Sequence, residues 1–129
     1  MRIEHIALWT SDLEKSKMFY ETFFGAHSGE KYVNEKKGFS SYFLSFESGC
    51  RLEIMTMRNA DSSENQPVEK FSGISHFAVS AGTKEKVDEL TNRIQGAGFC
   101  IASEPRETGD GYYESVVLDP DGNRVEITI

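Results

Sequence analysis

The sequence is poor in several features that would assign it to a particular protein class. Only two of its 129 residues are cysteines, Cys50 and Cys100. A small secreted domain stabilised by disulfides usually carries more cysteines at regular spacing. Neither residue belongs to a CxxC motif or has a histidine nearby in the sequence. We therefore expect both to be free thiols in a reducing compartment rather than nucleophiles.

Long apolar runs and an excess of positive charge are missing as well. No apolar run approaches the ~20 residues of a membrane-spanning helix, and we expect no charged-then-apolar leader. The formal net charge is −7, from 14 basic and 21 acidic residues, whereas nucleic-acid binding needs a basic surface. Glycine-rich phosphate loops and Ser-His-Asp arrangements are also lacking. We expect a soluble, cytoplasmic protein that acts on a small molecule, without a nucleic-acid or membrane partner.

The first half of the chain has the pattern of a strand, a helix and three further strands. Alternation of apolar residues predicts a strand over 2–10. Helical spacing predicts a helix over 12–23, with Ser11 or Asp12 as its N-cap and Gly25 at its end. The further strands are predicted at about 26–33, 39–46 and 50–58.

The same order of elements recurs after a polar segment. Residues 59–72 break the pattern and are predicted to be a linker. A strand at 73–81 and a helix at 83–98, closed by Gly96 or Gly98, are predicted to follow. The last strands are predicted near 99–104, 112–118 and 124–129, with a turn at 119–123. The fold class is therefore α+β: one domain, 1–129, of two βαβββ modules at about 1–58 and 73–129.

Short similar stretches in the two halves support this duplication. IEHIAL lies over ISHFAV, which pairs His5 with His76. SGCRLEI lies over DGNRVEI, which pairs Glu53 with Glu126. Each half thus carries one histidine on its first strand and one glutamate on its last.

The two glutamates interrupt apolar stretches, LEIM and VEIT. Side chains alternate along a strand, so Glu53 and Glu126 point away from their apolar neighbours, which we expect to pack on the helices. Two imidazoles and two carboxylates on that face suit a divalent cation. Taken singly, each glutamate can be interpreted as an ordinary solvated side chain and each histidine as an ordinary packed one. His27 has no counterpart in the other half, and we expect it at the surface.

Three further residues are candidates for a substrate pocket. Trp9 is predicted to share the face of His5, and Met55 and Met57 follow Glu53 on its face. Aromatic and thioether side chains are suited to an apolar pocket. Ordinary packing is the alternative for Trp9.

Four stretches carry a resemblance to a known superfamily: IEHIALWTSDLEKSKMFYETFFG, RLEIM, ISHFAVS and DPDGNRVEI. Over nearly its full length the chain resembles the vicinal-oxygen-chelate superfamily, and most of all its glyoxalase I (lactoylglutathione lyase) branch. The resemblance implies curved mixed sheets around a metal cavity, the glyoxalase/bleomycin resistance/dioxygenase fold. It also implies one divalent metal per site (Ni, Zn, Co or Mn), bound by His5, Glu53, His76 and Glu126. Three-ligand relatives, the extradiol dioxygenases and fosfomycin-modifying enzymes, lack a glutamate at the position of Glu53.

The implied activity is that of a carbon–sulfur lyase in methylglyoxal detoxification. A 2-oxoaldehyde thiohemiacetal is converted to a 2-hydroxyacyl thioester by enediolate proton transfer. Glu126 is the expected base, and Glu53 is the alternative. Glutathione-using bacterial members carry an arginine where this chain has Trp9, so the thiol carrier stays open.

Two other classes of function stay open. One is another metalloenzyme of the superfamily, such as an epimerase or a thiol transferase. The other is a metal-free protein that binds a small molecule and confers resistance. Chains of this length in such families are often homodimers. That assembly would join His5 and Glu53 of one subunit with His76 and Glu126 of the other, and closure of the site within one chain is the alternative.

Overall fold

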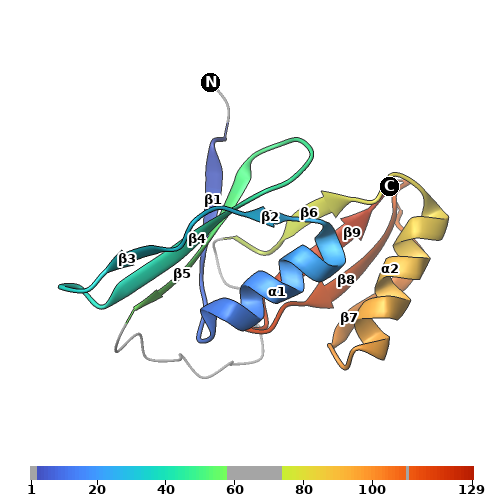
Figure 1. Ribbon diagram of the computed structural model, residues 1–129. Coiled ribbons are helices and arrows are strands. Elements are labelled where there is room, and N and C mark those ends of the chain that lie inside the picture. The colour runs from blue at the N-terminus through green and yellow to red at the C-terminus, as the bar shows by residue number, and fades with distance from the viewer. Residues whose placement is uncertain (1–2, 58–73, 110) are drawn as a thin grey trace. The chain divides into compact units, whose positions relative to one another are not determined.

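The computed structural model describes residues 3–57, 74–109 and 111–129. The chain divides into two compact units, Met1–Glu64 and Asn65–Ile129. Within each unit the element order is the predicted one, with a strand and a helix before the remaining strands (Figure 1). The predicted linker at 59–72 lies outside the described residues.

The first unit is a mixed five-stranded sheet with one helix. Its elements are β1 (His5–Trp9), α1 (Leu13–Phe24), β2 (His27–Ser28), β3 (Tyr32–Asn34), β4 (Phe39–Ser45) and β5 (Arg51–Met57). The strand order is β1-β5-β4-β2, and β3 also pairs with β4. The β1–β5 pair is parallel and the other pairs are antiparallel. The first and last strands of the unit are therefore neighbours.

The single strand predicted at 26–33 is two short strands in the structure. Ser28 pairs with Leu44, whereas Tyr32 pairs with Ser41. The outer strand therefore contains one residue more than β4 between these pairs, which is the signature of a bulge. The extra residue is defined by its pairing with β4, and so the sequence of 26–33 by itself did not reveal it.

Helix α1 begins and ends where its local sequence predicts. The Asp12 carboxylate accepts a hydrogen bond from the Lys15 backbone N–H at 3.0 Å and so caps the first turn. Gly25 ends the helix in the left-handed conformation, at φ 63°. The buried residues of α1 are Leu13, Ser16, Phe19 and Tyr20. The helix packs against β4 and β5 and covers one face of the sheet (Figure 1).

The second unit repeats this plan with four strands. Its elements are β6 (Phe77–Ser80), α2 (Lys84–Gly96), β7 (Ile101–Glu107), β8 (Tyr113–Leu118) and β9 (Arg124–Thr128). The order is β6-β9-β8-β7, with β6 and β9 parallel. Helix α2 packs on β7, β8 and β9. The predicted duplication of the fold is confirmed.

The turn predicted at 119–123 is built around the buried side chain of Asp119. Its Oδ1 atom accepts hydrogen bonds from the backbone N–H groups of Asp121 at 3.0 Å and Asn123 at 2.8 Å. Gly122 takes the positive φ of 84° that this turn needs. The turn sets the β8–β9 register, in which Val116 lies opposite Glu126.

None of the described helices is long and apolar enough to cross a membrane. Both cysteines are free thiols, as predicted, with Cys50 half-buried and Cys100 exposed. His27, also as expected, is exposed.

Candidate metal centre

The two predicted glutamates are more exposed than the residues that flank them in their strands. The side chain of Glu53 is 14% exposed and that of Glu126 is 17% exposed. The flanking residues Leu52 and Ile54, and likewise Val125 and Ile127, are fully buried. Alternation therefore puts the apolar side chains in the core beneath each helix, and the carboxylates on the opposite sheet face.

In the first unit, parallel pairing of β1 with β5 brings His5 and Glu53 onto one face. Ala7 lies opposite Glu53, with His5 two residues earlier in β1. The Nε2 atom of His5 is 3.9 Å from Oε2 of Glu53. This separation is too long for a hydrogen bond. The two groups face each other with room for a shared partner.

The other ring nitrogen of His5 is engaged by its neighbour in the sequence. Nδ1 of His5 lies 2.6 Å from Oε2 of Glu4. The second carboxylate oxygen of Glu4 accepts from Arg51, whose Nε is at 2.8 Å and whose terminal nitrogen is at 2.6 Å. These hydrogen bonds, first that from His5 and then that from Arg51, hold the pKa of Glu4 below its ordinary value.

The second unit brings His76 and Glu126 together in the same way. Nε2 of His76 is 3.4 Å from Oε2 of Glu126. Nδ1 of His76 faces Oγ of Ser75, also at 3.4 Å. The pair is thus the structural counterpart of His5 and Glu53, with a hydroxyl in place of the Glu4 carboxylate.

The surroundings of Glu126 favour the neutral form of its carboxyl group. Burial is the main cause of its raised pKa, and the nearby carboxylate of Glu114 is the second. His76 and Arg106 act in the opposite direction. Arg106 also forms an ion pair with Glu114 at 3.3 Å. A carboxylate with a raised pKa is a better proton acceptor than an ordinary one.

The donor set of each unit fits a divalent cation. A histidine nitrogen and a carboxylate oxygen bound to one ion at about 2.0–2.2 Å are held roughly 3–3.5 Å apart. The separation in the second unit lies in this range, and that in the first unit is slightly longer. Within either unit, taking the described residues only, no three His, Cys, Asp or Glu side chains are grouped to hold an ion. Each unit therefore brings together one histidine and one glutamate that could hold an ion.

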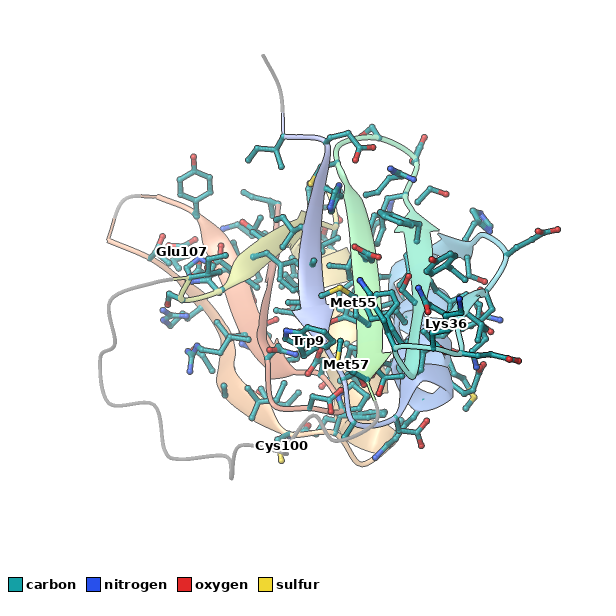
Figure 2. All side chains as sticks on the ribbon, turned by 90° about the vertical axis from the view of Figure 1, so that its left-hand side faces the viewer. Trp9, Lys36, Met55, Met57, Cys100 and Glu107 are labelled. Carbon is teal, nitrogen blue, oxygen red and sulfur yellow. The ribbon has the colours of Figure 1, made fainter. Side chains whose placement is uncertain are left out.

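The three predicted pocket residues lie on the face that carries His5 and Glu53. Trp9 lies opposite Met55 in the β1–β5 register, and Met57 lies two residues further along β5. Figure 2 shows these side chains gathered at the same end of the sheet. The ring of Phe39 packs edge-on against Trp9, with centroids 6.3 Å apart. The wall beside Glu53 is therefore aromatic and thioether in character.

Several residues around the pairs were not predicted from the sequence. Phe43 packs edge-on against the His5 ring at 5.3 Å and lies under the Arg51 guanidinium at 4.1 Å. Glu4, Glu114 and Arg106 complete this group of neighbours. The position of Glu114 beside Glu126 could have been predicted from the sequence, because the turn at 119–123 determines which β8 residues share the face of Glu126.

Comparison with known proteins assigns the family. Residues 2–127 match the Glyoxalase/Bleomycin resistance protein/Dioxygenase superfamily. The chain belongs to this superfamily. Its α+β fold of tandem modules is the fold of the family, as the sequence predicted.

The relatives to which the chain is similar include an uncharacterized protein and a dioxygenase. The chain is 26% identical over 128 residues to Uncharacterized protein YqjT of Bacillus subtilis (strain 168). This alignment covers 97% of this chain and 96% of that protein. It is 30% identical over 102 residues to Catechol-2,3-dioxygenase of the same organism. That alignment covers 77% of this chain and only 33% of the dioxygenase.

Among solved structures, the Leishmania major glyoxalase I, described as trypanothione-dependent, superposes with a TM-score of 0.76. The alignment covers 99% of this chain and 86% of that chain, at 22% sequence identity. At this identity the likeness establishes the shared superfamily fold.

Proposed function

We propose that this superfamily member is a metal-dependent isomerase of the glyoxalase I type. The observation that carries the proposal is the repeated His–Glu pair, His5 with Glu53 and His76 with Glu126. In the proposed centre the two pairs bind one divalent ion, which would be Ni, Zn, Co or Mn by donor chemistry. Four protein ligands of this type distinguish the centre from three-ligand sites of the same superfamily.

The proposed reaction converts a 2-oxoaldehyde thiohemiacetal to a 2-hydroxyacyl thioester. A bound divalent cation supplies Lewis acidity, which lowers the energy of negative charge on the substrate oxygens. Glu126 removes the proton from the carbon that bears sulfur, and an enediolate forms. The same proton returns to the neighbouring carbon, and the hydroxyl proton moves from the oxygen of the first carbon to the oxygen of the second. One C–H and one O–H bond break and one of each forms, so no redox reagent is needed.

The raised pKa of Glu126 supports its role as this base. Burial and the Glu114 carboxylate both favour the protonated form. A carboxylate in these surroundings binds a proton more readily at the moment of transfer. Glu53 is the alternative base, for a substrate of the opposite configuration.

The surface beside Glu53 supports a substrate with an apolar portion. Trp9 and Met55 are neighbours there, and Phe39 extends the same wall. An aromatic surface does not offer a charged partner for a carboxylate of the thiol carrier. We therefore propose a thiol adduct bound mainly by apolar contacts at this end of the first unit, in a cytoplasmic enzyme.

Two observations bear on the competing functions. The likeness to Catechol-2,3-dioxygenase favours a ring-cleaving reaction, but Glu53 would be an extra ligand in the three-ligand site of such an enzyme. An epimerase would use the same proton transfer on a different substrate. A metal-free binding protein would have no need of two paired imidazoles and carboxylates.

The proposal includes a homodimer. Each unit brings together two ligands, so a four-ligand centre requires one copy of each unit. In the proposed assembly the first unit of one subunit and the second unit of its partner form each centre, and a twofold axis gives two equivalent centres.

A panel of thiols tests the proposed reaction. The protein is loaded separately with Ni, Zn or Mn and assayed with methylglyoxal and glutathione, bacillithiol or coenzyme A. We expect thioester formation with one thiol, dependent on the loaded metal. Metal binding without thioester formation from any thiol would reject the glyoxalase I reaction and favour an epimerase or a dioxygenase.

A further inference from the structure

The two histidines of the proposed centre differ in what engages their Nδ1 atoms. His5 meets a carboxylate oxygen of Glu4 at 2.6 Å. His76 meets the hydroxyl of Ser75 at 3.4 Å. Glu4 and Ser75 each directly precede their histidine, so they are the same position of the duplicated module. The asymmetry is therefore a substitution within the repeat rather than a difference in fold.

The Glu4 contact determines which nitrogen of His5 carries the proton. A carboxylate only accepts hydrogen bonds, so Nδ1 of His5 must donate. In a neutral imidazole the proton is then on Nδ1, and the lone pair is on Nε2, the atom that faces Glu53. A hydroxyl both donates and accepts, and at 3.4 Å the Ser75 contact imposes little preference on His76.

Glu4 is itself held in place by charge and packing. Arg51 donates to its Oε1 atom from two nitrogens, at 2.8 and 2.6 Å. The guanidinium lies over the Phe43 ring at 4.1 Å, and the same ring packs edge-on against His5. Glu4, His5, Arg51 and Phe43 therefore form one connected cluster. Arg124 is the counterpart of Arg51 in the repeat, but Ser75 has no carboxylate to offer it.

We propose that Glu4, held by Arg51, is a positioning residue that fixes His5 in the Nδ1–H tautomer. His5 and Glu53 then form the better-ordered half of the metal centre, and the half with His76 and Glu126 is less constrained. A carboxylate on the outer nitrogen of a metal-binding histidine fixes the ring and raises its basicity. The metal-binding part of this inference rests on the proposed function, whereas the tautomer assignment does not.

The tautomer is measured in the metal-free, full-length protein by long-range 1H–15N correlation NMR at pH about 8, which is above the ordinary pKa of an imidazole side chain. Wild-type His5 should show the Nδ1–H pattern. In Glu4→Ala, His5 should change to a mixed or Nε2–H pattern. In Glu4→Gln, Arg51 can only donate and so engages the single amide oxygen, which turns the amide NH2 toward His5. His5 must then accept at Nδ1, so its pattern should change to Nε2–H. The matched substitution Ser75→Ala should leave the tautomer mixture of His76 nearly unchanged. An unaltered His5 pattern in Glu4→Ala would overturn the proposal.

Zinc titration by calorimetry supplies the second readout. Loss of an outer partner of a metal-binding histidine weakens affinity by about 10–100-fold, so Glu4→Ala should raise the dissociation constant by about tenfold or more. Ser75→Ala should raise it much less. If the wild type binds no zinc although Glu4→Ala changes the tautomer, the proposed function fails and the positioning of His5 stands. If both variants bind zinc as the wild type does, Glu4 has no role in metal binding.

Discussion

The Nε2 atom of His76 lies 3.4 Å from the Oε2 atom of Glu126. These residues are far apart in the sequence, and they meet because the first strand of the unit pairs in parallel with the last. The same β1–β5 pairing brings His5 to Glu53. Duplication of one module therefore produces two pairs, each of a histidine nitrogen and a glutamate oxygen, and each pair lies on the sheet face opposite the helix of its unit.

Substitution of Glu126 by glutamine tests its role as the base. Glutamine keeps the size and one oxygen donor but has no proton-accepting carboxylate, so kcat should fall by about 100-fold or more. Circular dichroism should be close to that of the wild type, and kcat is compared at saturating metal because the variant is expected to bind the ion more weakly. Glu53→Gln is the parallel variant. Full activity in Glu126→Gln with loss of activity in Glu53→Gln would transfer the role to Glu53.

The raised pKa of Glu126 predicts a pH effect on stability in the metal-free protein. The folded carboxyl keeps its proton above about pH 4.3, where an unfolded glutamate loses it. The folded state then binds more protons than the unfolded state, so the free energy of unfolding falls as pH rises through the folded pKa. In Glu126→Gln this contribution is absent.

Urea unfolding between about pH 4 and pH 8 measures this effect. The free energy of unfolding of Glu126→Gln, relative to wild type, should increase with pH across the range. Glu89→Gln, which alters an exposed carboxylate on α2, is the control for loss of a negative charge. Parallel profiles of wild type and Glu126→Gln would contradict the assigned direction of the pKa shift.

Substitution of Trp9 by alanine tests the apolar substrate wall. The Trp9 side chain lies opposite Met55 and is 54% exposed, so its removal deletes contact area for a ligand rather than core packing. KM should rise by roughly tenfold with little change in kcat, because uniform binding is lost. Met18→Ala removes a residue on α1 that is 61% exposed and should leave KM unchanged. Equal KM values in wild type and Trp9→Ala would exclude this wall from the substrate site.

Complementation between two inactive variants tests the shared site of the proposed homodimer. One variant carries His5→Ala and Glu53→Gln, and the other carries His76→Ala and Glu126→Gln. If centres form across the subunits, a heterodimer of the two variants has one intact centre. A statistical mixture should then recover roughly a quarter of wild-type activity. A mixture that exchanges subunits but stays inactive would indicate that each centre closes within one chain.

Most of the fold follows from local sequence patterns. Asp12 and Gly25 limit α1 as predicted, because a side-chain cap and a left-handed glycine act within one turn of the helix. The alternation around Glu53 and Glu126 assigned their face correctly, because a strand has a period of two. The division of 26–33 into β2 and β3 was missed, because the extra residue depends on pairing with β4 and leaves no local signal.

Fewer of the side-chain contacts around the candidate ligands could be predicted from the sequence. The Glu4 contact with His5 occurs just before β1 begins, where strand alternation does not apply. The pairing of Arg106 with Glu114 depends on the β7–β8 register, which contains irregularities. Glu114 itself was predictable, since the turn at 119–123 aligns β8 with β9. Contacts that depend on register across strands thus need the folded structure.

We propose that the two His–Glu pairs bind one metal ion, and the reaction depends on this binding. The most direct measurement is the metal content and Zn or Ni titration of the purified protein, with Glu53→Gln and Glu126→Gln titrated in parallel. We predict about one divalent ion per chain, in either arrangement of the subunits, and weaker binding when either carboxylate is replaced. A wild-type protein that contains no metal and takes up none on titration would contradict it.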